Sequence, residues 1–454
     1  MITNVHERAT LSDSFEFMGS WWLPENATSQ VPGIIRFEPS RRLSLTLLGR
    51  IDSYSPAAVL GSCQGVPCTL LQARYAGETT EMGQFGRLKL HGEKLLIGAH
   101  FESAQAAQFF KWKINFPELA AWHGGHPLHE TFHNALGVEQ GEVLDFTFKR
   151  PPSFHARMPP LNAALRIEHG FLYEVGEDFR CKHRADVHVI PDDKQDLHWF
   201  LNTTISLQAL LSLLIGCAIH PIEILAFQTD QEEELKPIRI YVPDIFPRGA
   251  AAEGALRLHF ETIRHSFDDI VREWFEIFDT HRSIYEALLG VMFNPESYLD
   301  AQFLALVQGL EGFHRREFPD LYVPSGEFEG FYRELVGGLP KRIPPNLRSA
   351  LADRLKYGNE YSLRRRLTEL VKGLPESIGE RFHKKPLEFV SEVVELRNRL
   401  VHFPVGDKLT VFDRQMLFVL TLKVRALLTI LLMKRLRVPN EAILAAAKFA
   451  SFGI

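Results

Sequence analysis

The sequence predicts an α+β multidomain chain in which a mostly-β N-terminal domain precedes an all-α helical bundle. In the first half, short apolar segments alternate with Gly, Pro, Asn and Asp, a pattern typical of strands joined by turns. After Gly254, apolar residues recur at three- and four-residue spacing, as they do along the buried face of a helix. The length of 454 residues favours two or three domains over one. We therefore expect one domain over residues 1–258 and a second over residues 259–454.

The expected strands of the first domain are short and contain many β-branched residues. They are GIIRFEP, LSLTLLG, CTLLQARY, KLLIGAHF and VLDFTFKR, then LRIEHG and DVHVIP after a Pro-rich break, and finally IEILAFQ and IRIYVPD. One helix is expected among them, from about residue 193 to residue 218, with Asp192 or Asp193 as its N-cap. Trp21 and Trp22 are expected to pack in the core.

The second domain is expected to contain seven to nine helices separated by proline-containing breaks. The apolar stripes that predict them cover residues 267–278, 281–292, 297–317, 325–339, 346–357, 362–374, 386–402 and 410–436. The last stripe is apolar on much of its surface, so we expect it in the bundle core or at an interface between subunits. This stripe and an earlier one near residues 205–219 contain polar or charged residues, which favours buried helices over membrane spans.

Composition and charge exclude several classes of protein. The net charge of −5 argues against a general nucleic-acid binder, although charge can still gather locally. Four scattered cysteines favour a reduced, cytoplasmic setting, and the N-terminus lacks the pattern of a signal peptide. No glycine-rich phosphate loop is present, so no nucleotide cofactor is expected.

A polar cluster near the end of one expected helix is the strongest sign of chemistry. In PLEFVSEVVELRNRLVHFPVGD, Leu387, Val390, Val394 and Val401 suggest an apolar face, and Arg397, Asn398 and His402 follow near its end. Asn398 and His402 are four residues apart and share one helix face, so the amide could orient the imidazole. Pro404 predicts that the helix ends near His402, where the helix dipole favours a protonated imidazole.

These side chains suit the cleavage of RNA without a metal ion. RNA carries its own nucleophile, the 2′-OH, and a histidine can accept or donate the proton. An arginine can hold the scissile phosphate through two hydrogen bonds. One copy of the motif lacks either the acid or the base, and two copies meeting across a dimer would supply both. A capped, solvated helix end fits the same spacing equally well.

The segment ELRNRLVH resembles the signature of HEPN ribonucleases, in which an arginine, a polar residue and a histidine occur at this spacing. AQFLALVQGLEGFHRRE is similar to an early helix of the ApeA-type anti-phage proteins. The segments GSWWLPE, LSLTLLGRI, GVPCTLLQA and INFPELAAW resemble the N-terminal domain of that family. The resemblance covers most of the chain, and it makes Arg397, Asn398 and His402 the catalytic residues.

The resemblance implies a HEPN-type, metal-independent endoribonuclease with no cofactor that acts as an abortive-infection effector. It also implies an even-numbered oligomer, simplest as a homodimer, formed through the HEPN helices. RNA, with tRNA as one candidate, would be the substrate, and a phage component would be the trigger. The competing interpretation is a non-catalytic HEPN protein whose β domain binds a ligand. A third is a carbohydrate-binding β module with a helical oligomerisation tail.

The segment that leads up to the motif and includes it is basic. Residues 341–402 contain 14 Lys and Arg against 8 Asp and Glu, which gives 14 − 8 = +6. Arg364, Arg365 and Arg366 are its densest point, and with Arg399 they are the expected RNA contacts. The alternative is that three adjacent arginines spread around a solvated helix.

A histidine cluster in the first domain has no assigned role. HGGHPLHETFH places His123, His126, His129 and His133 within 11 residues. Imidazole suits zinc, but the glycines and the proline predict a loop without the spacing of a zinc-binding helix. We therefore expect a loop and no metal site.

Overall fold

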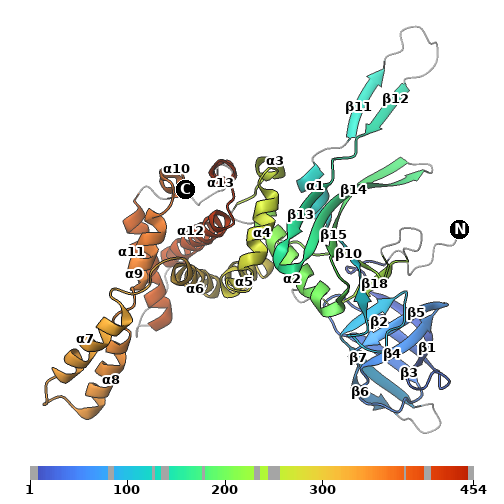
Figure 1. Cartoon of the computed structure of the whole chain (residues 1–454), viewed down its shortest axis with the longest axis horizontal. Helices are drawn as coiled ribbons and strands as arrows, with labels where there is room; N and C mark the ends of the chain where they lie inside the picture. The colour runs from blue at the N-terminus through green and yellow to red at the C-terminus, as the bar shows by residue number, and fades with distance from the viewer. Residues whose placement is uncertain are drawn as a thin grey trace.

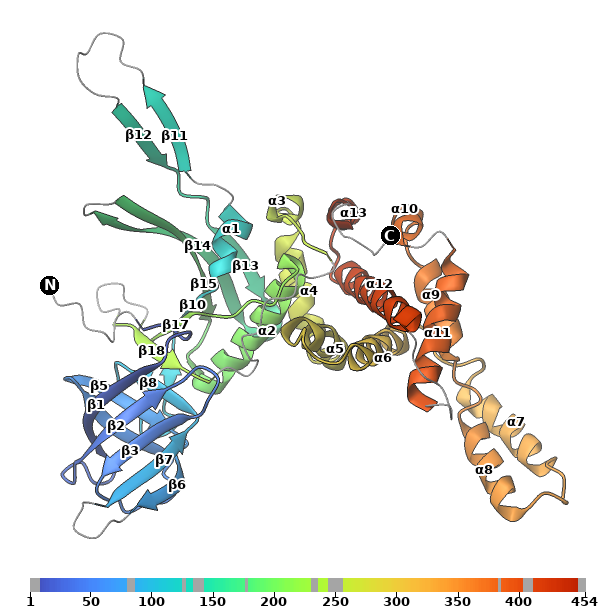
Figure 2. The same ribbon diagram turned by 180° about the vertical axis from the view of Figure 1, so that it is seen from behind.

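The computed structural model describes residues 9–79, 86–124, 128–133, 143–175, 179–229, 236–243, 256–382, 385–402 and 411–447. Strands gather at the N-terminal end of the molecule and helices at the C-terminal end (Figures 1 and 2). The predicted α+β architecture is therefore confirmed.

The strands form a large antiparallel sheet. Their bounds are β1 Phe15–Trp22, β2 Val31–Phe37, β3 Leu43–Leu48, β4 Ala58–Cys63, β5 Val66–Leu71, β6 Arg74–Thr79, β7 Arg87–Gly92, β8 Lys94–Ile97, β9 Gln108–Phe109, β10 Lys111–Asn115, β11 Leu128–His133, β12 Val143–Phe148, β13 Phe154–Met158, β14 Ala163–Val175, β15 Phe179–Pro191, β16 Gln195–Asp196, β17 Glu223–Phe227 and β18 Ile238–Tyr241. Fourteen of these described strands pair in the order β13-β14-β15-β10-β17-β18-β8-β5-β4-β1-β2-β3-β7-β6. Trp21 and Trp22 are buried, as predicted.

The helix expected in the first domain is α2, Leu197–Ile215. Its N-cap is Asp196, whose side chain accepts a hydrogen bond from the backbone N–H of Trp199 at 2.8 Å. The prediction of Asp192 or Asp193 was wrong because β15 continues to Pro191 and a short strand, β16, follows it. Gly216 ends the helix with φ of 78°, a conformation that favours glycine.

The remaining helices follow the predicted stripes closely. Their bounds are α1 Pro117–Gly124, α3 Phe260–Ile263, α4 Phe267–Ile277, α5 Arg282–Phe293, α6 Leu299–Glu317, α7 Ser325–Gly337, α8 Pro345–Lys356, α9 Leu363–Lys372, α10 Glu376–Phe382, α11 Pro386–His402, α12 Val411–Arg435 and α13 Asn440–Ala447. Each predicted stripe corresponds to one helix, while α1, α3, α10 and α13 were not expected. We propose residue 258 as the domain boundary, since the described strands end at β18 and the second group of helices begins at α3.

Two helices project from the bundle as an arm. α7 and α8 extend away from α9 and α11 (Figure 1), and neither contributes a buried residue. The base of the arm is fixed by Asn359, whose side chain accepts from the N–H of Val323 at 3.0 Å and donates to its carbonyl at 2.8 Å. A bridge between Leu321 and Glu360 closes the same base.

Two described helices are long and apolar enough to cross a membrane, by length and composition alone. They are α2 and the part of α12 from Asp413 to Arg435. In both, about two thirds or more of the apolar window is buried inside the protein, at 72% and 67%. This burial is what the core helices of a folded domain require.

Candidate functional site

Helix α11 carries the predicted motif on the face that is turned away from the bundle. Its buried residues are Phe389, Val390, Val393, Leu396 and Leu400. Leu387 and Val401, which were assigned to the apolar face, are 58% and 43% exposed, so that assignment was wrong. The buried positions 389, 393, 396 and 400 recur at four, three and four residues, so they follow the helical repeat on a different side of the helix from the predicted face.

The three motif residues lie together at the end of α11. Arg397 is partly exposed, and Asn398 and His402 are exposed. The Nη1 of Arg397 donates a hydrogen bond to the Oδ1 of Asn398 at 3.2 Å. The amide oxygen therefore orients the arginine, whereas we had expected Asn398 to orient the imidazole. An arginine held in this way presents its remaining N–H groups for a phosphate.

Arg364 lies on the same side of α11 as the motif. Its Nη1 donates to the Oγ of Ser391 at 2.6 Å, and its Nη2 is 4.0 Å from a carboxylate oxygen of Glu395. Positions 391, 395, 398 and 402 are spaced by four, three and four residues, so they form one stripe along the helix. Position 402 is seven residues beyond Glu395, or about 10 Å along the axis.

The other expected RNA contacts have different surroundings. Arg366 is fully buried, so the prediction that it lies on an RNA-binding surface was wrong. Arg365 pairs with Glu369 at 3.0 Å, and its guanidinium lies 3.6 Å from the centre of the Tyr361 ring. Arg399 forms an ion pair with Asp413 at 2.9 Å, which joins α11 to α12. Of the four arginines, Arg364 has the most exposed side chain.

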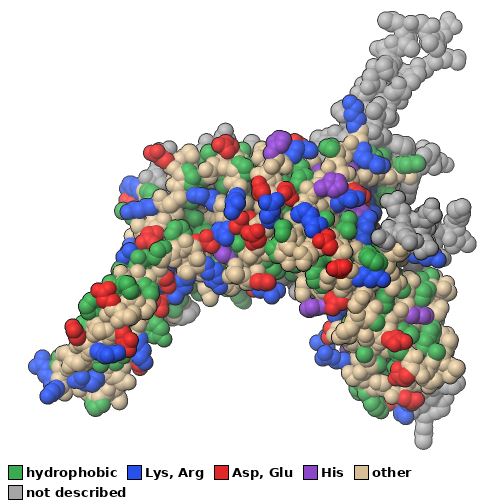
Figure 3. Space-filling model, viewed as in Figure 1, with side chains coloured by type: hydrophobic (Ala, Val, Ile, Leu, Met, Phe, Trp, Pro, Cys, Tyr) green, Lys and Arg blue, Asp and Glu red, His purple; other side chains and the backbone are tan. Residues whose placement is uncertain are grey.

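The basic segment is spread over several surfaces. Lys341 and Arg342 are exposed in the turn between α7 and α8, and Figure 3 shows Lys and Arg side chains at that end of the arm. The net charge of +6 in residues 341–402 therefore does not form one patch beside His402.

Arg366 is the centre of a buried ion-pair cluster. Its guanidinium contacts Glu311 of α6 at 2.8 Å and Asp320 at 2.6 Å, and Glu360 lies at 3.6 Å. Glu311 also pairs with Arg315 at 3.3 Å. Glu311 of α6 thus pairs with Arg366 of α9 and with Arg315 of its own helix.

The sheet domain contains a row of three histidines, of which only His123 was singled out from the sequence. His123 is in the last turn of α1, and its Nδ1 lies 2.7 Å from the Nε2 of His169. The Nδ1 of His169 lies 2.9 Å from the Nε2 of His183. His123 and His169 are almost fully buried. The three rings form a hydrogen-bonded chain and do not converge on one point.

The other histidines of the predicted cluster cannot be assigned to this row of hydrogen-bonded histidines. His129 and His133 belong to β11, which replaces part of the expected loop. Residue 126 and the side chains at 129 and 133 lie outside the described residues. Within the described residues, no group of three or more His, Cys, Asp or Glu side chains is arranged to hold a metal ion.

Burial makes all three imidazoles hard to protonate. It lowers the pKa of His123 to about 3 and the pKa of His169 to about 4, and it also lowers the pKa of His183. Neighbouring imidazoles and Arg264 lower the pKa of His123 further, and Glu261 opposes them. At neutral pH these three imidazoles are therefore uncharged.

The comparisons with known families cover both halves of the chain. Residues 16–274 match the family model described as ApeA N-terminal domain 1. Residues 304–442 match the model described as Apea-like HEPN, which spans α11 and the motif. No curated protein and no solved structure matches the chain.

The buried ion-pair cluster predicts a large loss of stability in Arg366→Met. Removing the cation leaves the carboxylates of Glu311 and Asp320 close together with only Arg315, at 3.3 and 3.4 Å, to offset their charge, which should cost about 3–5 kcal/mol. Arg364→Met is the matched control, because it removes an exposed arginine from the same helix and should cost less than about 1 kcal/mol. Denaturant unfolding measures both, and equal values for the two variants would contradict the cluster's role.

The histidine chain predicts that the sheet domain loses stability as the pH falls. The folded-state pKa values lie below the ordinary value, so the stability is complete above about pH 6.5 and is lost as the unfolded chain binds protons. Because of His123 and His169, the free energy of unfolding should fall by about 3 kcal/mol as the pH is lowered from 7.5 to 5.5. Over the same pH range, the double variant His123→Gln/His169→Gln should lose about 3 kcal/mol less stability than the wild type. The control variant His155→Gln changes an exposed histidine and should keep the wild-type dependence of stability on pH. A double variant with the wild-type pH dependence would refute the assignment of this dependence to His123 and His169.

Proposed function

The chain belongs to the ApeA-like family, with an ApeA N-terminal domain followed by an Apea-like HEPN domain as the sequence predicted, and from this premise we propose that it is a metal-independent endoribonuclease. The observation that carries the proposal is the exposed set of Arg397, Asn398 and His402 at the end of a helix whose other face is buried. The match of this segment to the Apea-like HEPN model favours this function over a merely solvated helix end. We include in this proposal a cytoplasmic location, an RNA substrate such as tRNA, and a phage-derived trigger.

The proposed reaction uses the 2′-OH of the RNA as the nucleophile. The 2′-oxygen attacks the adjacent phosphorus, the bond from phosphorus to the 5′-oxygen breaks, and a 2′,3′-cyclic phosphate and a 5′-OH result. His402 of one subunit accepts the proton of the 2′-OH, and the same residue of a second subunit donates a proton to the departing 5′-oxygen. Arg397 binds the non-bridging phosphate oxygens as negative charge builds on them.

A two-fold dimer is part of the proposal because one histidine cannot act as acid and base in the same step. Exposed apolar side chains near the motif are the surface that such a dimer would cover. Val401 is beside His402, and Phe418 on α12 is 52% exposed. Phe418 is five residues beyond Asp413, which the ion pair with Arg399 holds against α11. A symmetric contact through α11 and α12 would bury these side chains and bring the two motifs together.

Arg364 is the supporting RNA contact that we retain. From α9 it contacts Ser391, on the stripe of α11 that includes Asn398 and His402, and half of its side chain is exposed. A phosphate next to the scissile one could pair with it. Arg366 is excluded from this role because it is buried. Arg365 and Arg399 are already engaged in ion pairs, so we do not retain them as RNA contacts.

The competing function is a non-catalytic HEPN protein that dimerises and leaves recognition to the β domain. It requires no chemistry from the motif, so substitutions there separate the two. His402→Ala and Arg397→Ala should each lower RNA cleavage by at least about 100-fold, as expected for the loss of proton transfer or phosphate binding. Both residues have exposed atoms, so the free energy of unfolding should change by less than about 0.5 kcal/mol.

Cleavage is measured on labelled RNA in the presence of EDTA, with analysis of the product ends. The wild type should stay active under these conditions and should leave a cyclic phosphate. His155→Ala, an exposed histidine of β13, is the matched control and should cut at the wild-type rate. Wild-type rates in both motif variants would favour the non-catalytic function, and activity that needs a divalent ion would refute the metal-free mechanism.

The proposed interface has its own prediction. Phe418→Glu should convert the dimer to a monomer, because a charge would be buried against the partner. RNA cleavage should fall with it, since the second His402 is lost. Tyr298→Glu changes an aromatic residue that is 86% exposed at the start of α6, and it should leave both properties unchanged. Mass measurement in solution across a concentration series decides, and a Phe418→Glu variant that dimerises like the wild type would rule out this interface.

A further inference from the structure

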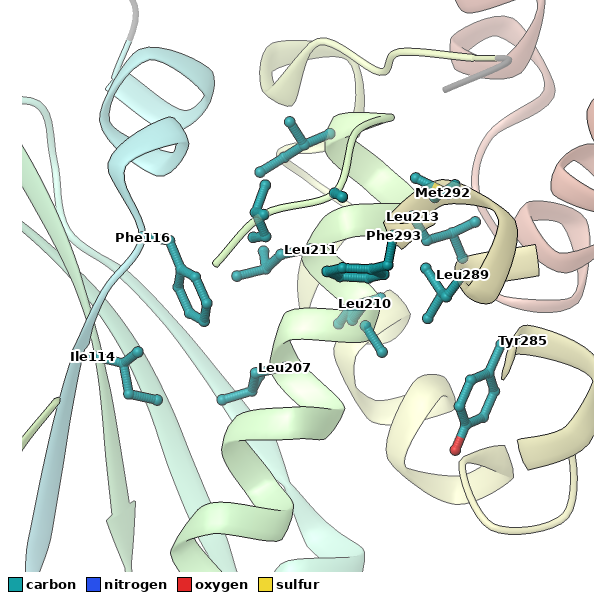
Figure 4. Close-up of a cluster of buried hydrophobic side chains, with 14 of the residues drawn as sticks. Ile114, Phe116, Leu207, Leu210, Leu211, Leu213, Tyr285, Leu289, Met292 and Phe293 are labelled. Atoms are coloured by element: carbon teal, nitrogen blue, oxygen red, sulfur yellow. The ribbon is translucent and has the colours of Figure 1, made fainter. Parts of the chain in front are cut away.

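A cavity lies in the seam between the sheet domain and the helical domain. Its volume is about 230 Å³. One wall comes from α2 and the other from the end of α4 and from α5. The residues that line it are Ile205, Gln208, Ala209, Phe278, Arg282, Tyr285, Glu286, Leu289, Gly290 and Phe293. Figure 4 shows the neighbouring cluster of buried side chains, in which Leu210 of α2 faces Leu289 and Phe293 of α5.

Tyr285 leaves a polar group unsatisfied in this wall. The side chain is buried, and its ring stacks on Phe278 with a centroid separation of 4.9 Å. Its hydroxyl is buried without a hydrogen-bond partner among the described residues. A buried hydroxyl without a partner costs about 1–3 kcal/mol. A bound molecule with a hydrogen-bonding group could supply the missing partner.

Gly290 keeps the space beside it open. It lies inside α5, where glycine costs about 0.5–1 kcal/mol relative to alanine. A Cβ added at this position meets no atom within 4 Å, so close packing does not require a glycine here. Any larger side chain at Gly290 would project from the wall of the cavity.

Among the described residues that line the cavity, Arg282 is the one cation and Glu286 the one anion. The Nε of Arg282 donates to the Oε1 of Glu286 at 3.0 Å. The guanidinium lies 6.0 Å from the centre of the Phe278 ring. Its two terminal nitrogens make no hydrogen bond within the described part of the chain, and they have the geometry to bind a carboxylate or phosphate through two bonds.

We propose that this cavity is a binding site for a small planar aromatic molecule that carries one anionic group. The ring occupies the apolar slot between α2 and α5, and the anion pairs with Arg282 at the rim. The volume of about 230 Å³ accommodates a single or fused aromatic ring, and it is small for a drug-sized ligand. Because the ligand contacts both domains, it stabilises their association. Binding does not depend on the proposed RNase activity, so the two can be tested separately.

Three related probes test the ligand class with the full-length protein. Indole-3-acetate has the ring and an anion, indole has the ring alone, and tryptamine has the ring and a cation. Indole-3-acetate should bind to the wild type with a Kd below about 1 mM and raise the melting temperature, since a ligand of the folded state stabilises it. Indole should bind more weakly and tryptamine weakest. Failure of indole-3-acetate to bind, or tighter binding of tryptamine, would overturn the proposal.

Matched glycine variants test the location. Gly290→Leu should weaken the binding of indole-3-acetate at least tenfold, because the new side chain fills the cavity. It should not destabilise the unliganded protein, since leucine is a better helix former than glycine. Gly337→Leu makes the same change at an open position of α7 and should bind like the wild type. Unchanged affinity in Gly290→Leu would refute the site.

Two further variants test the polar contacts. Tyr285→Phe should leave the unliganded protein as stable as the wild type or more so, since it removes an unsatisfied hydroxyl. The same variant should bind indole-3-acetate several-fold more weakly. Arg282→Gln should bring the affinities for indole-3-acetate and indole within about twofold of each other. An unchanged preference for the anion in Arg282→Gln would contradict the proposed orientation.

Discussion

The burial of most of α2 between the sheet and the helical bundle is the constraint on which the rest of the structure depends. This helix is apolar around most of its circumference, so a single sheet cannot cover it. On one side, Trp112 of β10 stacks on Phe200 and donates its indole N–H to Thr204 at 3.0 Å. On the other side, Trp274 of α4 donates its indole N–H to the hydroxyl of Ser206 at 2.9 Å. The sheet domain and the first helices of the bundle are therefore packed around one shared helix.

Ion pairs carry this connection further into the bundle. Arg435, at the end of α12, pairs with Glu273 of α4 and with Glu317 of α6. His281, which precedes α5, bonds to Glu317 at 2.7 Å. The proposed ligand site lies at the start of this series of contacts and the motif on α11 at its far end. A ligand that changed the packing of α5 on α2 would act on the elements that support α6 and α12, which is one physical route from the proposed ligand site to the motif.

Helical periodicity made the second half of the chain predictable from sequence. Stripes with proline breaks located α4 to α9, α11 and α12, and the short α10 and α13 were missed because they offer little more than two turns of pattern. The buried face of α11 was misassigned because Leu387 and Val401 are apolar yet exposed. The three motif residues were chosen because their types and spacing resemble a known signature, and their catalytic role stays a prediction.

Long-range pairing was the part that sequence reasoning could not supply. Arg366 lies within a stripe with Leu363, Leu367 and Leu370, and that placement is a signal of burial that the run of three arginines obscured. Its closest partners, Glu311 and Asp320, precede it by 55 and 46 residues in the chain. In the same way, His123 was grouped with its neighbours in sequence, whereas the fold joins it to His169, 46 residues later.

The most direct test of the account is the distance between the two copies of position 402 in the assembled protein. A nitroxide label on His402→Cys, in a Cys181→Ser background that removes the only cysteine of the four that is not buried, reports that distance by pulsed electron resonance. The shared-cleft dimer predicts one narrow distribution below about 20 Å, or roughly two helix diameters. A monomer, or two labels separated by more than about 40 Å, the span of some four helices, would contradict it.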